Sequence, residues 1–142
     1  MSLLMRNMVR MLNEQDMNFD FDEDTDTITM QEKLGKINVD AIILICGPKE
    51  KDEHTGRVQI FIFDFCPISD ISISLYDTIN HLNETYRWFR TYINMDKHRQ
   101  IVLSCDAIVD IHDPVDEIIE LVIRGAHVAE EIYPQIMKVI WR

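Results

Sequence analysis

The C-terminal segment, from Asp113 to Arg142, holds more apolar residues than a helix with most of its surface in water can carry. Asp113 and Pro114 predict where this helix begins, because an Asp side chain can cap free backbone N–H groups and Pro suits the first helical position. Such a helix must bury more than half of its circumference, which requires a sheet beneath it and makes a partner molecule a further candidate. Its apolar residues recur at helical spacing in two adjacent stripes, the first with Val115, Ile119, Val122, Ala126, Ala129, Tyr133, Ile136 and Ile140, and the second with Ile118, Leu121, Gly125, Val128, Ile132 and Val139.

Two segments in the middle of the chain have the composition of strands buried on both faces. They run from Asn38 to Cys46 and from Arg57 to Cys66, and both carry large apolar residues at odd and even positions. A strand with one face in water would instead alternate apolar with polar residues. We therefore expect the centre of the sheet to be covered, at least in part, on both sides. The second strand places apolar residues on both of its faces, with Ile60 and Ile62 on one side and Phe61, Phe63 and Phe65 on the other.

The rest of the chain completes an α+β pattern. Helical periodicity marks two shorter helices, and alternation marks two hairpins. The order is α-β-β-β-β-α-β-β-α, which predicts a single mixed, largely antiparallel sheet with helices packed on it. A length of 142 residues suits one domain, spanning residues 1–142. The helices are expected from Leu4 to Asn13 and from Leu75 to Glu84, and the hairpins pair Met17–Phe21 with Thr27–Glu32 and Trp88–Met95 with Gln100–Asp110.

The charge of the chain restricts its partners. With 14 basic and 25 acidic residues, its formal net charge is -11. A field of that sign repels phosphate backbones and anionic lipid, so we expect neither nucleic acid nor a membrane as a partner. Three cysteines, Cys46, Cys66 and Cys105, lie in apolar, strand-like contexts without a C-x-x-C pair, which is typical of reduced thiols in a cytoplasmic protein. The longest apolar run, Ala41–Cys46, is far shorter than the ~20 residues that span a bilayer.

No local pattern carries catalytic or ligand-binding chemistry. The acidic run Asp20–Asp26 lacks the Gly and Glu that an EF-hand calcium loop needs at its sixth and twelfth positions, and we interpret it as a solvated turn. His127 and Glu131 stand one helical turn apart, but both fall on the polar seam of the C-terminal helix, and no third ligand has a characteristic spacing. There is no G-x-S-x-G elbow and no glycine-rich phosphate loop. We predict no catalytic residues, no cofactor and no metal.

Aromatic residues instead predict an interface. Trp88 and Tyr92 fall on one side of a late strand, and Phe61, Phe63 and Phe65 share one face of a central strand. The second helix is short and covers only part of that face, so an apolar patch larger than monomers usually expose would remain. We expect a homodimer to bury this patch, and capture of an extended segment of another protein or peptide is the alternative.

The stretch from Leu75 to Trp141 resembles the YbjN-type bacterial domain, a family described as sensory transduction regulators. The resemblance rests on His81-Leu82-Asn83 at the end of the second helix, on Trp88-Phe89-Arg90, on the long strand after it, and on Tyr133-Pro134 in the C-terminal helix. The N-terminal half matches in the order of its elements. One departure is Asp96-Lys97-His98, where the family often has a glycine.

That family is similar to the type III secretion chaperone fold, which comprises small, acidic α+β proteins that usually dimerise and bind extended segments of partner proteins. The resemblance therefore implies a non-enzymatic protein-binding or regulatory module, and it supplies no catalytic residues to carry over. A secretion-chaperone-like protein with an extended client segment is the alternative function. A small enzyme with an unrecognised site is the third.

Overall fold

The structure, a computed structural model, describes residues 1–34, 37–47, 54–96 and 98–141. Within these residues the chain forms three helices and six strands in the expected α+β order. All five strand pairings are antiparallel, so the sheet contains no parallel pair among the described strands. The elements are α1 (Leu3–Glu14), β1 (Asp20–Asp22), β2 (Thr27–Leu34), β3 (Ile37–Gly47), β4 (Thr55–Phe63), α2 (Ile73–Thr85), β5 (Arg90–Asn94), β6 (Gln100–Asp110) and α3 (Val115–Ile140).

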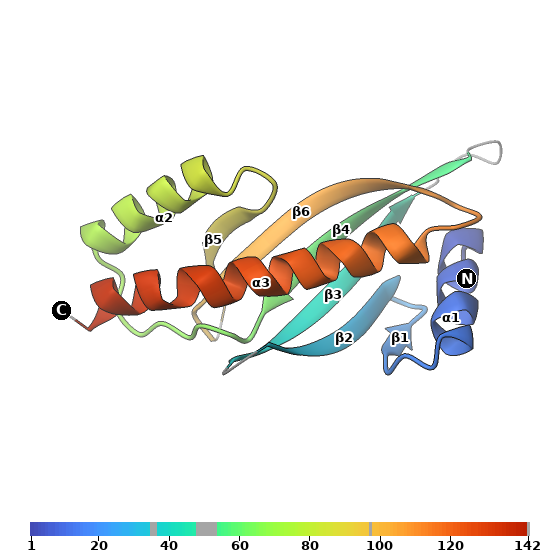
Figure 1. Cartoon of the computed structure of the whole chain (residues 1–142), viewed down its shortest axis with the longest axis horizontal. Helices are drawn as coiled ribbons and strands as arrows, with labels where there is room; N and C mark the ends of the chain where they lie inside the picture. The colour runs from blue at the N-terminus through green and yellow to red at the C-terminus, as the bar shows by residue number, and fades with distance from the viewer. Residues whose placement is uncertain (35–36, 48–53, 97, 142) are drawn as a thin grey trace.

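The strands lie in the order β1-β2-β3-β4-β6-β5. The first four form a meander in which each strand pairs with the next along the chain. The chain then leaves the sheet through α2 and returns at the far edge as β5. The long strand β6 closes the gap by pairing with β4 on one side and β5 on the other, so residues that are distant in sequence meet at the β4–β6–β5 end of the sheet (Figure 1).

Helix α3 crosses one face of the sheet from end to end, as Figure 1 shows, and contacts β2, β3, β4 and β6. Its buried residues come from both apolar stripes, which confirms that the two stripes together face the core. Gly125 lies where the helix comes closest to the sheet. A Cβ atom there would lie 2.7 Å from Ile62 Cγ1 and 3.0 Å from Phe89 Cε1, so the close side chains of the core account for this glycine.

The start of α3 differs from what the sequence predicts. The helix begins at Val115 with Pro114 at the N-cap position and no side-chain cap, so the expected capping by Asp113 is wrong. Asp113 is instead part of the preceding turn, where its backbone N–H donates to the Asp110 carbonyl oxygen. Near the other end, Pro134 lies inside the helix, which continues through it to Ile140. Pro134 is exposed, so water can reach the carbonyl group that its ring leaves without an N–H partner.

Helices α1 and α2 belong to the same hydrophobic core as α3. Helix α1 packs Leu4 against Gly56 of β4, and Asn7 Nδ2 donates a hydrogen bond of 2.8 Å to the Ile111 carbonyl oxygen. Helix α2 buries the three predicted residues Leu75, Ile79 and Leu82, and it packs against α3 and β5. Among the described residues no helix packs on the opposite side of the sheet, so the expectations that α2 covers part of the second face and that the chain covers the sheet centre on both sides are wrong.

The side of the sheet without a helix, here called the open face, also carries apolar residues. In β3 every second residue from Val39 to Ile45 is buried beneath the helices, and the alternate residues are only half-buried. Strand β4 repeats this pattern, with Ile60 and Ile62 in the core and the residues between them on the open face. Among the described apolar and aromatic residues on the open face are Ile42, Phe61, Phe63, Tyr92 and Val102.

No helix in the described part of the chain is long and apolar enough to cross a membrane.

Candidate functional site

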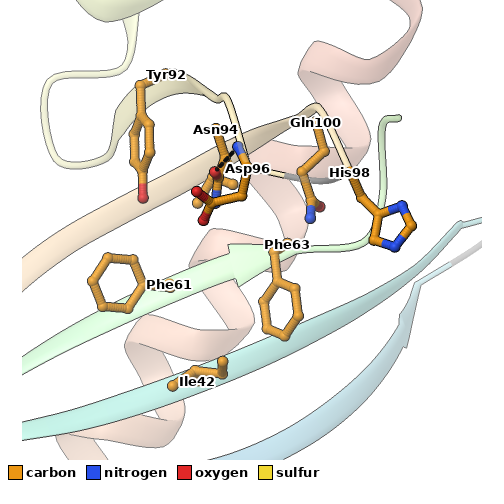
Figure 2. A pocket seen from close by; sticks show the side chains of 9 residues that line it. Ile42, Phe61, Phe63, Tyr92, Asn94, Asp96, His98 and Gln100 are labelled. Carbon is orange, nitrogen blue, oxygen red and sulfur yellow. Dashed lines mark hydrogen bonds between the residues drawn. The ribbon is translucent and has the colours of Figure 1, made fainter. Parts of the chain in front are cut away.

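The open face contains a hollow of about 710 Å³, here called the open-face hollow (Figure 2). Strands β3 and β4 form its floor, and β6, β5 and the turn between β5 and β6 form one wall. Its residues are Ile42, Phe61, Phe63, Tyr92, Asn94, Asp96, His98, Gln100 and Val102.

The strand register explains why these side chains meet. Ile42 lies opposite Phe61 in the β3–β4 pairing, and Tyr92 lies opposite Val102 in the β5–β6 pairing. Side chains directly opposite on antiparallel strands point to the same face and stand close together. Figure 2 shows the Tyr92 hydroxyl group and the Asp96 carboxylate both pointing from the β5 side toward the two phenylalanine rings. The hollow is therefore apolar at its floor and polar along one wall.

The structure brings together three of the five residues expected at an interface. Phe61, Phe63 and Tyr92 line the open-face hollow, and all three are half-buried. Phe65 does not join them, because β4 ends at Phe63 and Asp64 adopts a left-handed conformation with φ 61°. This turn directs Phe65 into the core, where it is 5% exposed.

Trp88 also lies apart from the hollow. It precedes β5, is 68% exposed, and belongs to a second hollow of about 580 Å³ between β6 and α3. Ile108 of β6, which is 69% exposed, lies in the same hollow with Leu121 and Arg124 of α3. We call this second hollow the edge surface. Its residues are Trp88, Asp106, Ala107, Ile108, Glu117, Glu120, Leu121 and Arg124.

A free strand edge accompanies the edge surface. Strand β5 pairs with β6 only as far as Arg90 and Ser104, whereas β6 continues to Asp110. The hydrogen bond from the Ile111 N–H to the His54 carbonyl oxygen shows that odd-numbered residues of β6 point their backbone groups toward β4. The backbone groups of Asp106 and Ile108 therefore point outward and meet no strand in the described part of the chain.

Two carboxylates lie beside the open-face hollow. Asp40 of β3 is opposite Phe63, and Asp64 directly follows Phe63. A hydrogen bond with Asp64, partial burial and repulsion by the Asp64 charge together raise the pKa of Asp40 from 3.8 to about 6, against a smaller lowering by Gln31. The backbone N–H of Asp64 donates to Gln100 Oε1 at 2.7 Å, which ties this pair to the wall of the hollow.

The thiols in the core lack the features of nucleophiles. Burial raises the pKa of Cys66 to about 11, and burial with the nearby Asp106 charge raises the pKa of Cys105 to about 11. Both are therefore protonated at neutral pH, whereas the thiolate is the reactive form. Cys46 is half-buried, and all three cysteines are free.

The described residues contain no cluster of three or more His, Cys, Asp or Glu side chains that could hold a metal ion. His127 and Glu131 are both exposed on α3. Glu131 instead accepts a hydrogen bond of 2.7 Å from the Tyr86 hydroxyl group, which raises the pKa of Tyr86 and links the end of α2 to α3.

Sequence reasoning did not identify several residues of these surfaces. Val102 and Gln100 enter the hollow only because β6 lies between β4 and β5, and a sequence pattern does not reveal that order. The pairing of Asp40 with Asp64 likewise depends on the β3–β4 register and on the left-handed turn. One sequence feature could have indicated that Ile108 is exposed: it is a large apolar residue between Asp106 and Asp110 near the end of a strand.

A comparison with protein-family models finds no match for this chain, and no curated protein matches its sequence.

Proposed function

We propose that this chain is a non-enzymatic protein-binding or regulatory module of the YbjN type, and that the open-face hollow is its binding surface. The observation that carries the proposal is the group formed by Phe61, Phe63 and Tyr92 on a sheet face that no described helix covers. Aromatic side chains with a polar rim are typical of protein-binding surfaces, because they bury a large area at a small cost in side-chain entropy. The sequence resemblance to YbjN-type domains supports the same class of function.

A chaperone-like protein with an extended client segment is the alternative, and the free edge of β6 favours it. An extended segment can add to a sheet by pairing with outward-pointing backbone groups, such as those of Asp106 and Ile108. Exposed Trp88 and Ile108 would flank such a segment and supply apolar contacts. In this alternative the client segment becomes an additional strand of the sheet and makes main-chain hydrogen bonds with β6.

We also propose that the protein is a cytoplasmic homodimer and that the edge surface forms the dimer interface. Two copies related by a two-fold axis would bring two free β6 edges together in antiparallel pairing. The edge surface offers a second copy the exposed apolar side chains of Trp88 and Ile108, and its cation, Arg124, donates a hydrogen bond of 2.9 Å to Glu120. Three free cysteines fit the reducing conditions of the cytoplasm.

Site-specific photo-crosslinking in the cells that express the protein tests the binding function. A benzophenone side chain replaces Tyr92 in the open-face hollow, and the matched control carries it in place of Tyr76, an exposed tyrosine on α2. We expect a discrete adduct with another protein from the first position and none from the second. Equal adducts at both positions, or no adduct at Tyr92, would contradict the proposed binding surface.

A further inference from the structure

The open-face hollow is acidic on one side. Asp96 lines the hollow, and the Asp40–Asp64 pair lies beside Phe63 at its end. The whole chain carries a net charge of -11, so the long-range field at this face has the same sign as the local charges. An apolar floor with carboxylates on one side is complementary to a ligand that combines an apolar group with a cation.

Among the residues that the structure describes, no cation forms an ion pair with Asp40 or Asp64. Arg90 lies over the Tyr92 ring, with its guanidinium carbon 5.2 Å from the ring centroid. His98 lines the hollow on the side of Gln100, and Lys33 lies further along β2, opposite Asn38. Among the described residues, the ion pairs are Arg10–Glu14 and Arg124–Glu120, and neither includes a carboxylate of the open face.

We infer that the open-face hollow binds a basic segment of another protein, which places an apolar side chain on Phe61 and Phe63 and a Lys or Arg side chain at Asp40 and Asp64. This inference rests on the proposed function and adds the chemistry of the partner. A guanidinium group suits the site well, since two neighbouring carboxylates offer the acceptors that its planar set of N–H donors can reach.

A second copy of this chain fits the open-face hollow poorly. A symmetric dimer through this face would bring two acidic sides together, with Asp40, Asp64 and Asp96 of each copy near those of the other. Like charges placed opposite each other at an interface oppose association. The acidic side of the open face therefore favours a basic partner over a second copy at this surface.

Acidity should weaken the binding of such a partner. A cation favours the ionised form of Asp40, so binding competes with protonation of Asp40. The groups that face Asp40 are Gln31 on β2 and Asp64 after β4, and Lys33 and Asp96 are the nearby charges on the same face. His98 also lines the hollow, so an H98Q variant separates its contribution from that of Asp40.

Fluorescence anisotropy with three synthetic peptides of ten residues tests the inference on the full-length protein. The first peptide alternates leucine with lysine, the second alternates leucine with glutamate, and the third alternates serine with lysine. We expect the leucine–lysine peptide to bind at least about tenfold more tightly than either control, because it alone supplies both the apolar contact and the charge. Its affinity should fall as the pH is lowered through 6, in the H98Q variant as well.

Two matched pairs of variants locate the binding site. The double change D40N and D64N should weaken the leucine–lysine peptide by about tenfold, and D77N with E84Q, which removes two exposed charges from α2, should leave it unchanged. Phe63→Ser should abolish binding of the same peptide, whereas Ile73→Ser, at an 81% exposed position on α2, should leave it unchanged. Circular dichroism of each variant confirms that it is folded.

Each other outcome has a defined meaning. Equal binding of the leucine–glutamate peptide, with loss in Phe63→Ser, would retain the open face as a binding surface and overturn the basic partner. Equal weakening by the α2 double variant would show that binding follows only the net charge, and would overturn the site. Self-association that disappears in Phe63→Ser would assign the hollow to a second copy.

Discussion

At the scale of single residues, Asp40 and Asp64 make the stability of the fold depend on pH. The pKa of Asp40 is raised to about 6 in the folded chain, above its ordinary value of 3.8, so the folded state binds this proton more tightly than the unfolded state does. The resulting stabilisation is fully present below about pH 4 and is lost as the pH rises through about 6. At neutral pH, two charged groups therefore repel each other beside Phe63.

Asp40→Asn should increase stability at neutral pH and have little effect near pH 4, because it removes this repulsion only where Asp40 is ionised. The gain should not exceed about 1 kcal/mol, since much of the pair is open to solvent that screens it. Urea denaturation at the two pH values measures the effect. The control Asp77→Asn removes an exposed charge on α2 and should show no such pH dependence; a gain that is equal at both pH values would contradict the assignment.

The neighbouring phenylalanines should respond very differently to truncation. Phe65→Ala removes a side chain that is 5% exposed in the core and should cost about 3–5 kcal/mol. Phe63→Ala removes a half-buried side chain from the open face and should cost about 1 kcal/mol. Chemical denaturation of the two variants gives the comparison, and similar losses at both positions would mean that the open face is covered in the free protein.

At the scale of elements, two alanine substitutions in α3 should change the free energy of unfolding in opposite directions. Gly125→Ala adds a Cβ atom 2.7 Å from Ile62, a fully buried side chain that has little room to move. Overpacking of this kind typically costs about 1–3 kcal/mol and outweighs the ~1 kcal/mol gain in helix propensity. We expect a net loss of about 1 kcal/mol in the free energy of unfolding. A more stable Gly125→Ala variant would show that the helix can move away from the sheet at no cost.

Pro134→Ala should instead stabilise the protein. Pro134 is exposed in the last part of α3, so alanine restores a backbone N–H donor without adding volume to the core. The expected gain is about 1–3 kcal/mol, up to the intrinsic difference between the two residues in a helix. Thermal unfolding followed by circular dichroism measures it. An unchanged melting temperature would indicate that the rest of α3 already absorbs the effect of the proline.

The elements themselves could be predicted from the sequence, whereas their partners could not. The two stripes of α3 and the three buried positions of α2 follow from helical periodicity, which depends only on local spacing. The predicted start of α3 is one residue too early, and the capping by Asp113 is wrong because Asp113 lies in a turn, where its backbone N–H donates to Asp110. Phe65 was assigned to the wrong face because alternation cannot reveal where a strand ends, and a left-handed Asp64 ends this one.

The candidate site was predictable only in part, for the same reason. Phe61, Phe63 and Tyr92 point to one face by residue alternation, but they meet only because β6 pairs with both β4 and β5. Trp88 carried the same aromatic signal and lies on a different surface, since β5 begins two residues after it. Contacts between strands that are distant in sequence depend on topology, which local patterns do not contain.

At the scale of the whole molecule, the two apolar surfaces predict an assembly with separate roles for each. Light scattering across a dilution series should show a dimer at micromolar concentration. Ile108→Glu should convert it to a monomer, because a charge would then be buried beside Trp88 at the two-fold axis. Ile73→Glu on α2 is the matched control and should remain dimeric. A monomer at all concentrations in the unmodified protein would contradict the dimer.

Helix α3 follows all six strands in the chain, and this order has a consequence for how the protein is made. All six strands leave the ribosome before the helix that covers them, and the residues of β2, β3, β4 and β6 beneath α3 have no cover until Val115–Ile140 has been synthesised. Translation proceeds at about 5–20 residues per second, so the nascent sheet spends on the order of seconds with its apolar side bare. A ribosome that pauses near Asp113 would leave the strands made so far without the helix that covers them, and so at their most prone to aggregate.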